Sequence, residues 1–113
     1  MEKFPSPENV QENIEKEKVL EMLRANGLGH PETMEMVIAW TKQQEALVEK
    51  EGTASARILF EIERSDLYLA VGDIEGALEC LEDALTQAHQ ENEDEFYSQI
   101  IKKMDEIETG FGK

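Results

Sequence analysis

The sequence predicts an all-α protein of about five antiparallel helices. Leu, Ala, Glu, Met and Ile are abundant, and these residue types favour helices. Apolar residues recur at helical spacing, whereas β-branched runs that alternate with polar residues are absent. The 113 residues are 40% hydrophobic and 33% charged, which suits one globular domain over residues 1–113. Residues 1–5 and 109–113 are expected to be frayed tails.

The first two helices are predicted from their end signals. Ser6-Pro7-Glu8 places an N-cap residue, a proline and an acid in the order that opens a helix. This helix is predicted to run from Pro7 to Asn26 and to end at Gly27, because glycine readily adopts the conformation that terminates a helix. By the same reasoning, the second helix begins at Pro31 and ends at Gly52.

The remaining helices are predicted over Ala54–Val71, Ile74–Gln90 and Asp94–Glu108. Thr53 can cap the first of these, and Asp73 can cap the next through hydrogen bonds to free backbone N–H groups. Gly72 lies between them and can enter the left-handed region without a Cβ clash. A connection this short requires the two helices to pack antiparallel.

The stretch Ser65–Leu85 carries small and large residues in a repeating order along this hairpin. The residues that define the pattern are Tyr68, Gly72-Asp73, Ala77, Leu81 and Ala84. This stretch resembles one tetratricopeptide repeat (TPR), and the other helices would flank it. The pattern does not recur at an offset of about 34 residues, so the first two helices are either a degenerate repeat or a different structure.

The resemblance implies a concave inner face on the helix that precedes Gly72, the face that binds peptides in TPR domains. The positions it places there include Leu59, Ile62, Asp66 and Leu69. Members that clamp a terminal carboxylate have Lys and Asn where this chain has Ile62 and Asp66, so that clamp is absent. The apolar inner face is expected to be covered by the second helix or by a partner, either another protein or a second copy of the chain.

The second helix has more apolar positions than one stripe requires. Either this helix is buried on two sides, or Met36 and Trp40 face a partner. Met and Trp are common both in cores and at helix-binding surfaces. Both residues are therefore candidate partner-binding residues, together with the four on the inner face.

The charge balance is strongly acidic, with 26 Asp and Glu against 11 Lys and Arg and a net charge of −15. Binding to nucleic acid or to an anionic membrane is disfavoured, because both require clustered cations. Residues 73–95 contain nine acids and no Lys or Arg. This segment is either a solvated outer surface or a docking strip for a basic partner.

No catalytic pattern is recognisable, and the sequence predicts neither a cofactor nor a metal site. His30 fits a loop or N-cap position, and His89 lies near a helix end, where a cation is favoured. Cys80 is the single cysteine and is expected to be a small core or boundary side chain. The absence of a signal-peptide pattern and of a long apolar run favours a cytoplasmic protein.

Together these observations predict a non-enzymatic protein-interaction module, an adaptor or chaperone-like protein that binds a helix or peptide through an apolar groove. The acidic surface would steer basic partners towards it. The alternatives are a self-associating homodimer and a regulatory subunit of a larger assembly.

Overall fold

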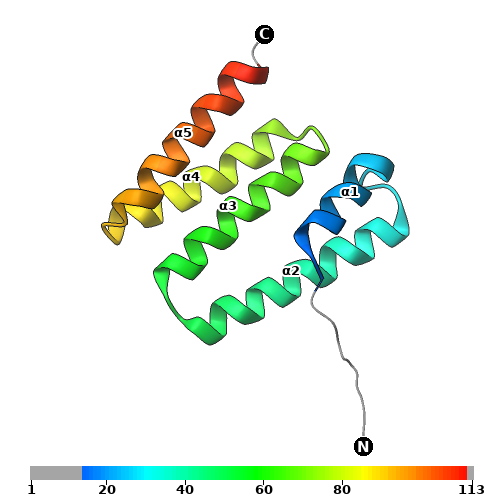
Figure 1. Cartoon of the computed structure of the whole chain (residues 1–113), viewed down its shortest axis with the longest axis horizontal. Coiled ribbons are helices and arrows are strands. Elements are labelled where there is room, and N and C mark those ends of the chain that lie inside the picture. Colours follow the sequence, from blue (N-terminus) through cyan, green and yellow to red (C-terminus); the bar gives the residue numbers. More distant parts are fainter. Residues whose placement is uncertain (1–13, 112–113) are drawn as a thin grey trace, which may run out of the picture.

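A computed structural model describes residues 14–111 of the chain, and it confirms the all-α prediction for that part (Figure 1). The helices are α1 (Lys16–Asn26), α2 (Pro31–Glu51), α3 (Ala54–Ala70), α4 (Ile74–Gln90) and α5 (Asp94–Phe111). None of these helices is long and apolar enough to cross a membrane.

The turn between α3 and α4 forms as its sequence predicts. The Thr53 hydroxyl accepts a hydrogen bond from the Ala56 N–H at 3.1 Å at the start of α3. The Asp73 carboxylate accepts one from the Gly76 N–H at 2.9 Å at the start of α4. Gly72 has φ of 79°, and the Asp73 N–H donates to the Tyr68 carbonyl at 2.9 Å. These local bonds close the hairpin.

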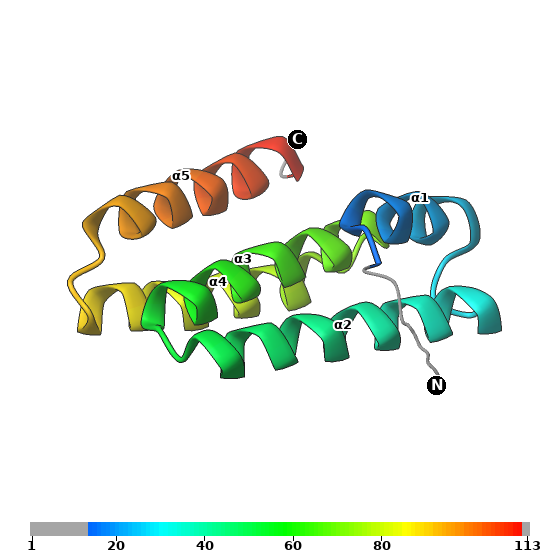
Figure 2. The ribbon, with the colours of Figure 1, turned by 60° about the horizontal axis from the view of Figure 1, so that its bottom comes forward.

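The helices form two layers, and α3 lies in the middle of one of them. Figure 2 shows α1 and α5 on one side of a layer that contains α2, α3 and α4. Helix α3 contacts α1, α2 and α4, while α5 rests mainly on α4. We call the side of α3 that faces the α1–α5 layer the inner face, and the opposite side the outer side.

Two apolar clusters hold these layers together, and α3 contributes to both. The buried residues of the first cluster are Val19, Leu20, Leu23, Trp40, Phe60 and Leu67. Those of the second are Ile58, Leu81, Ala84, Ala88, Ile100 and Ile107. The first cluster joins α1 and α2 to α3, and the second joins α4 and α5 to α3. Burial on both sides therefore fixes the central position of α3.

The first helix begins later than its sequence predicts. Helix α1 starts at Lys16, and Glu15 before it is extended, with φ of −81° and ψ of 135°. The Ile14 N–H donates to the Gln43 side-chain oxygen at 2.9 Å instead of continuing a helical ladder. A continuous helix from Pro7 to Asn26 is therefore wrong, because a long-range hydrogen bond to α2 competes with the local pattern. The predicted start at Ser6–Glu8 lies outside the described residues.

The last helix continues beyond its predicted end at Glu108. Helix α5 runs to Phe111, so Thr109 and Gly110 are helical and do not form a frayed tail. The Thr109 hydroxyl donates to the Asp105 carbonyl at 2.6 Å within the last turns. The predicted tail over residues 1–5 and the last two residues of the predicted tail over 109–113 lie outside the described residues.

Gly76 generates a prediction about the packing of the hairpin. A Cβ at this position would lie 2.6 Å from the Tyr68 ring and 2.8 Å from the capping carboxylate of Asp73. Gly76→Ala should therefore lower the free energy of unfolding by about 1–3 kcal/mol in urea titrations, since overpacking strains the site. This is opposite in sign to the usual gain of roughly 1 kcal/mol for Gly to Ala in a helix.

Gly110 provides the matched control. It is also helical, and a Cβ there would meet nothing within 4 Å. Gly110→Ala should leave stability unchanged or slightly raised. Equal stability changes in the two variants would show that the Tyr68 ring does not constrain position 76.

Candidate functional site

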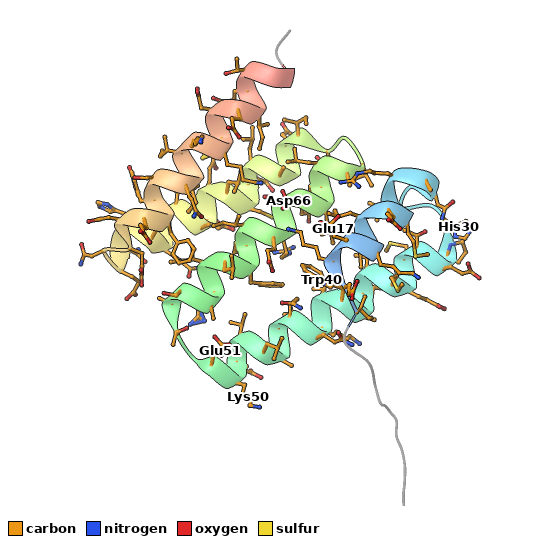
Figure 3. All side chains as sticks on the ribbon, viewed as in Figure 1. Glu17, His30, Trp40, Lys50, Glu51 and Asp66 are labelled. Carbon is orange, nitrogen blue, oxygen red and sulfur yellow. The ribbon has the colours of Figure 1, made fainter. Side chains whose placement is uncertain are left out.

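Trp40 and Met36, two of the predicted partner-binding residues, lie in the first apolar cluster. Trp40 is only 1% exposed, and its ring centroid lies 6.2 Å from that of Phe60 (Figure 3). Met36 is partly buried against the same cluster. Trp40 is therefore not free to bind a partner, and the prediction is wrong for this residue. The alternative prediction, that this helix is buried on two sides, holds instead, because α2 contacts both α1 and α3.

The predicted inner face is partly covered as well. Ile62 and Leu69 are half-buried against the second apolar cluster. Leu59 is 45% exposed. Helix α2 borders this face only at its start, where Leu47 and Val48 line a hollow with Leu59, so the expectation that the second helix covers the face is wrong. Helices α1 and α5 flank it, and Leu59 near the start of α3 lies outside their cover.

Asp66 ties α1 and α5 to the inner face. One carboxylate oxygen lies 2.6 Å from Lys16 Nζ of α1, and the other lies 2.8 Å from Lys103 Nζ of α5. Burial by itself raises the pKa of Asp66, but the hydrogen bonds from Lys103 and Lys16 outweigh it and lower the pKa below its ordinary value. Asp66 therefore connects α3 to α1 and α5 through ion pairs, and its carboxylate is not free to bind a ligand.

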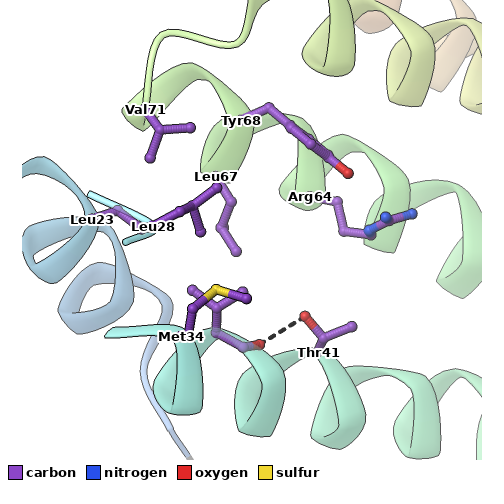
Figure 4. A pocket seen from close by; sticks show the side chains of 9 residues that line it. Leu23, Leu28, Met34, Thr41, Arg64, Leu67, Tyr68 and Val71 are labelled. Atoms are coloured by element: carbon purple, nitrogen blue, oxygen red, sulfur yellow. Dashed lines mark hydrogen bonds between the residues drawn. The ribbon is translucent and has the colours of Figure 1, made fainter. Parts of the chain in front are cut away.

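A separate apolar pocket opens on the outer side, between α2 and α3 (Figure 4). We call it the outer pocket, and its volume is about 160 Å³. It is lined by Leu23, Leu28, Met34, Val37, Thr41, Arg64, Leu67, Tyr68 and Val71. The Thr41 hydroxyl donates to the Val37 carbonyl at 2.8 Å, so this polar group is already satisfied within α2.

The rim of the outer pocket carries exposed apolar side chains. Leu28 in the α1–α2 loop and Met34 in the first turn of α2 both line the pocket and are exposed. Ile38 follows Met34 by one helical turn and is 47% exposed. These three residues extend the apolar surface from the pocket along α2.

Arg64 and Tyr68 form the polar edge of the pocket. The Arg64 guanidinium lies 3.2 Å from Glu61 and within 5.7 Å of the Phe60 ring centroid and 6.0 Å of the Tyr68 ring centroid. Burial lowers the pKa of Arg64, but the negative charge of Glu61 more than compensates and raises it. The guanidinium therefore remains a paired cation that is stacked on aromatic rings.

Helix α4 borders Arg64 and Tyr68 on the far side from the pocket. The Tyr68 ring occupies the space beside Gly76, and Cys80 lies close enough to Arg64 and Glu61 to interact with their charges. Burial raises the pKa of Cys80 to about 11, so the thiol is protonated at neutral pH and a poor nucleophile. The predicted core or boundary position of Cys80 is confirmed, since the residue is buried.

The acidic segment lies on the surface as an exposed band. Of its nine acids, Glu93 alone is partly buried, and it accepts a hydrogen bond from the Ser55 hydroxyl at 2.9 Å. Glu79 follows Gly76 by three residues and Asp83 follows Cys80 by three, so both lie on the side of α4 that borders Tyr68 and Arg64.

Comparison of the chain with known protein families, with curated proteins and with solved structures found no match. The TPR resemblance therefore stays a prediction, and the geometry of the described residues has to carry the functional argument. Within residues 14–111, no group of three or more His, Cys, Asp or Glu side chains is placed to hold a metal ion. His30 occupies the N-cap position of α2, as its sequence context predicts.

The outer pocket was not predicted from the sequence. Arg64 and Tyr68 are four residues apart, so they share one side of α3, and Asp66 between them points to the opposite side. That spacing was a usable signal for a second functional surface on α3. Leu28, by contrast, lies in a loop, where no periodicity could place it beside Met34.

The ion pairs of Asp66 generate a prediction about pH. Because the pKa of Asp66 is lowered in the folded state, its contribution to stability is present at neutral pH and is lost as the pH falls below about 4. Asp66→Asn should therefore lower the free energy of unfolding by about 1 kcal/mol at pH 7 in low salt. The difference in the free energy of unfolding between wild type and Asp66→Asn should disappear near pH 2 and become smaller in high salt.

The control is Asp105→Asn, since Asp105 is exposed on α5. It removes the same charge and should change stability at pH 7 by less than about 0.5 kcal/mol. A gap between wild type and Asp66→Asn that persists unchanged at low pH would contradict an ionic role for Asp66.

Proposed function

We propose that this chain is a TPR-like, non-enzymatic interaction module that binds a helix or peptide through the outer pocket. The observation that supports this most directly is the apolar pocket of about 160 Å³ with exposed Leu28 and Met34 on its rim. Exposed apolar surface beside a concave pocket is typical of binding sites. The single cysteine suits a reducing compartment, and we propose the cytoplasm as the place of action.

The proposal moves the binding surface from the predicted groove to the other side of α3. On the inner face, Asp66 is paired with two lysines, and Ile62 and Leu69 pack against the second cluster. In the outer pocket, Met34 and Leu28 are exposed without such partners among the described residues. Of the four predicted inner-face residues only Leu59 is exposed, whereas Leu28, Met34 and Ile38 are all exposed around the outer pocket. A partner therefore covers more exposed apolar area there, and burial of such area is the main source of binding free energy.

Ile38 and Ile101 provide a matched test of the proposal. Ile38 lies beside the outer pocket and is 47% exposed, whereas Ile101 lies on α5 and is 44% exposed. Helical peptides would be selected from a displayed random library against the wild-type chain. Ile38→Glu should then weaken binding of the recovered peptides by about tenfold or more, because it places a charge in an apolar contact.

Ile101→Glu adds the same charge at an equally exposed site and should leave binding within about twofold. Urea unfolding of both variants checks that the fold is retained. Recovery of no binders, or binders that respond equally to both substitutions, would refute the proposal.

A further inference from the structure

We infer that the occupant of the outer pocket is a basic amphipathic helix. It would place one bulky apolar side chain in the pocket and Lys or Arg side chains against Glu79 and Asp83 of α4. This inference rests on the proposed function and adds the chemical class of the partner. Three observations support it: the size of the pocket, the distance between α2 and α4 on the two sides of α3, and the charge of α4.

The outer pocket fits one large apolar side chain. Its volume is about 160 Å³, and its lining is mostly aliphatic. A comparable apolar cavity of about 150 Å³ accommodates a benzene ring. A Leu, Met or Phe side chain is therefore the size that fills the pocket, while a charged side chain there would lack the partners that burial requires.

The surface around the pocket has room for a helix. Helices α2 and α4 both pack against α3, one on each side. Close-packed helix axes lie about 8–10 Å apart, and the outer pocket separates part of α2 from α3, so the axes of α2 and α4 are at least about 16 Å apart across α3. A helix about 10 Å in diameter can lie over α3 between them. Met34 and Ile38 form an apolar ridge one turn long for it to contact.

We call the surface over α3 between α2 and α4 the groove, with α2 and α4 as its two walls. These two walls differ in charge. Towards the other end of α2, the cations Lys42 and Arg57 line a depression together with Glu45, Glu49 and Glu61, so positive charge there is compensated. Arg64 in the floor is paired with Glu61.

The α4 wall has no such compensation. Glu79 and Asp83 are exposed, and within residues 14–111 neither forms an ion pair. Residues 73–95 supply no Lys or Arg beside them. A helix lying in the groove therefore meets an apolar side and an unopposed acidic side, which is the pattern that a basic amphipathic helix complements.

A second copy of the chain is a poorer occupant. Each chain carries a net charge of −15, so two copies repel each other at low ionic strength. A cationic partner is attracted by the same field.

The test uses two synthetic peptides of about 18 residues, or five helical turns, with one shared Leu stripe. The basic peptide carries Lys on the flank of the stripe, and the neutral peptide carries Gln at the same positions. Binding to the full chain is measured by fluorescence anisotropy at about 0.05 M and about 0.5 M NaCl. We expect the basic peptide to bind at least tenfold tighter in low salt and the difference to collapse in high salt.

A pair of double variants separates contact with α4 from general attraction. Glu79→Gln with Asp83→Asn removes two charges beside the groove. Asp105→Asn with Glu106→Gln removes two exposed charges from α5, which lies in the layer on the inner side. The first pair should reduce the preference for the basic peptide to about threefold or less, and the second should retain most of it.

Each other outcome overturns the inference in a recognisable way. Equal binding of both peptides, lost in Ile38→Glu, would refute the basic partner and leave the proposed function intact. Equal effects of the two double variants would show attraction by net charge without a contact at α4. A dimer in light scattering that Ile38→Glu dissociates would identify a second copy as the occupant. Failure of both peptides to bind, while library-selected peptides bind and are weakened by Ile38→Glu, would refute the basic helix and leave the proposed function intact.

Discussion

The architecture depends on the requirement that α3 bury two opposite flanks at once. Phe60 and Leu67 point into the cluster shared with α1 and α2, while Ile58 points into the cluster shared with α4 and α5. Neither pair of outer helices can leave without exposing one flank to water, and burial of such side chains stabilises by about 1.5–3 kcal/mol each. The position of α1 and α2 on one flank of α3, and of α4 and α5 on the other, follows from this constraint.

The same constraint distributes the polar residues of α3. With two flanks apolar, its charged residues are confined to the two remaining sides. Asp66 lies on the inner face and reaches Lys16 and Lys103 in the helices that flank it. Arg64 lies on the outer side, where Glu61 and the aromatic rings of Phe60 and Tyr68 surround it. The ion pairs thereby hold α1 and α5 against part of the inner face, where Leu59 stays exposed, and the outer side keeps an open apolar pocket.

Features set by neighbouring residues were predictable. The caps at Thr53 and Asp73 and the left-handed Gly72 form as expected, because each uses hydrogen bonds within a few residues along the chain. The start of α1 was not, because Ile14 bonds to Gln43 on another helix. Local patterns cannot report a competing bond from a distant segment.

The candidate site shows the same division. Periodicity makes Trp40 and Leu59 equal candidates for partner binding, yet Trp40 is 1% exposed and Leu59 is 45% exposed. Which apolar side chain is covered depends on where neighbouring helices lie, and no spacing within one helix contains that information. The outer pocket was missed for this reason, since Leu28, Met34 and Val71 come from three separate segments.

The sequence by itself determined the helical class, the α3–α4 hairpin and the acidic character of α4, because propensity, capping and charge are properties of short segments. Only the tertiary structure decided which apolar residues are core and which remain open. Packing of α1 against α2 and α3 buries Trp40, while the space between α2 and α3 beside Met34 stays open as the outer pocket. Whether an apolar side chain is accessible depends on how the helices pack together, so the sequence of a single helix does not determine it.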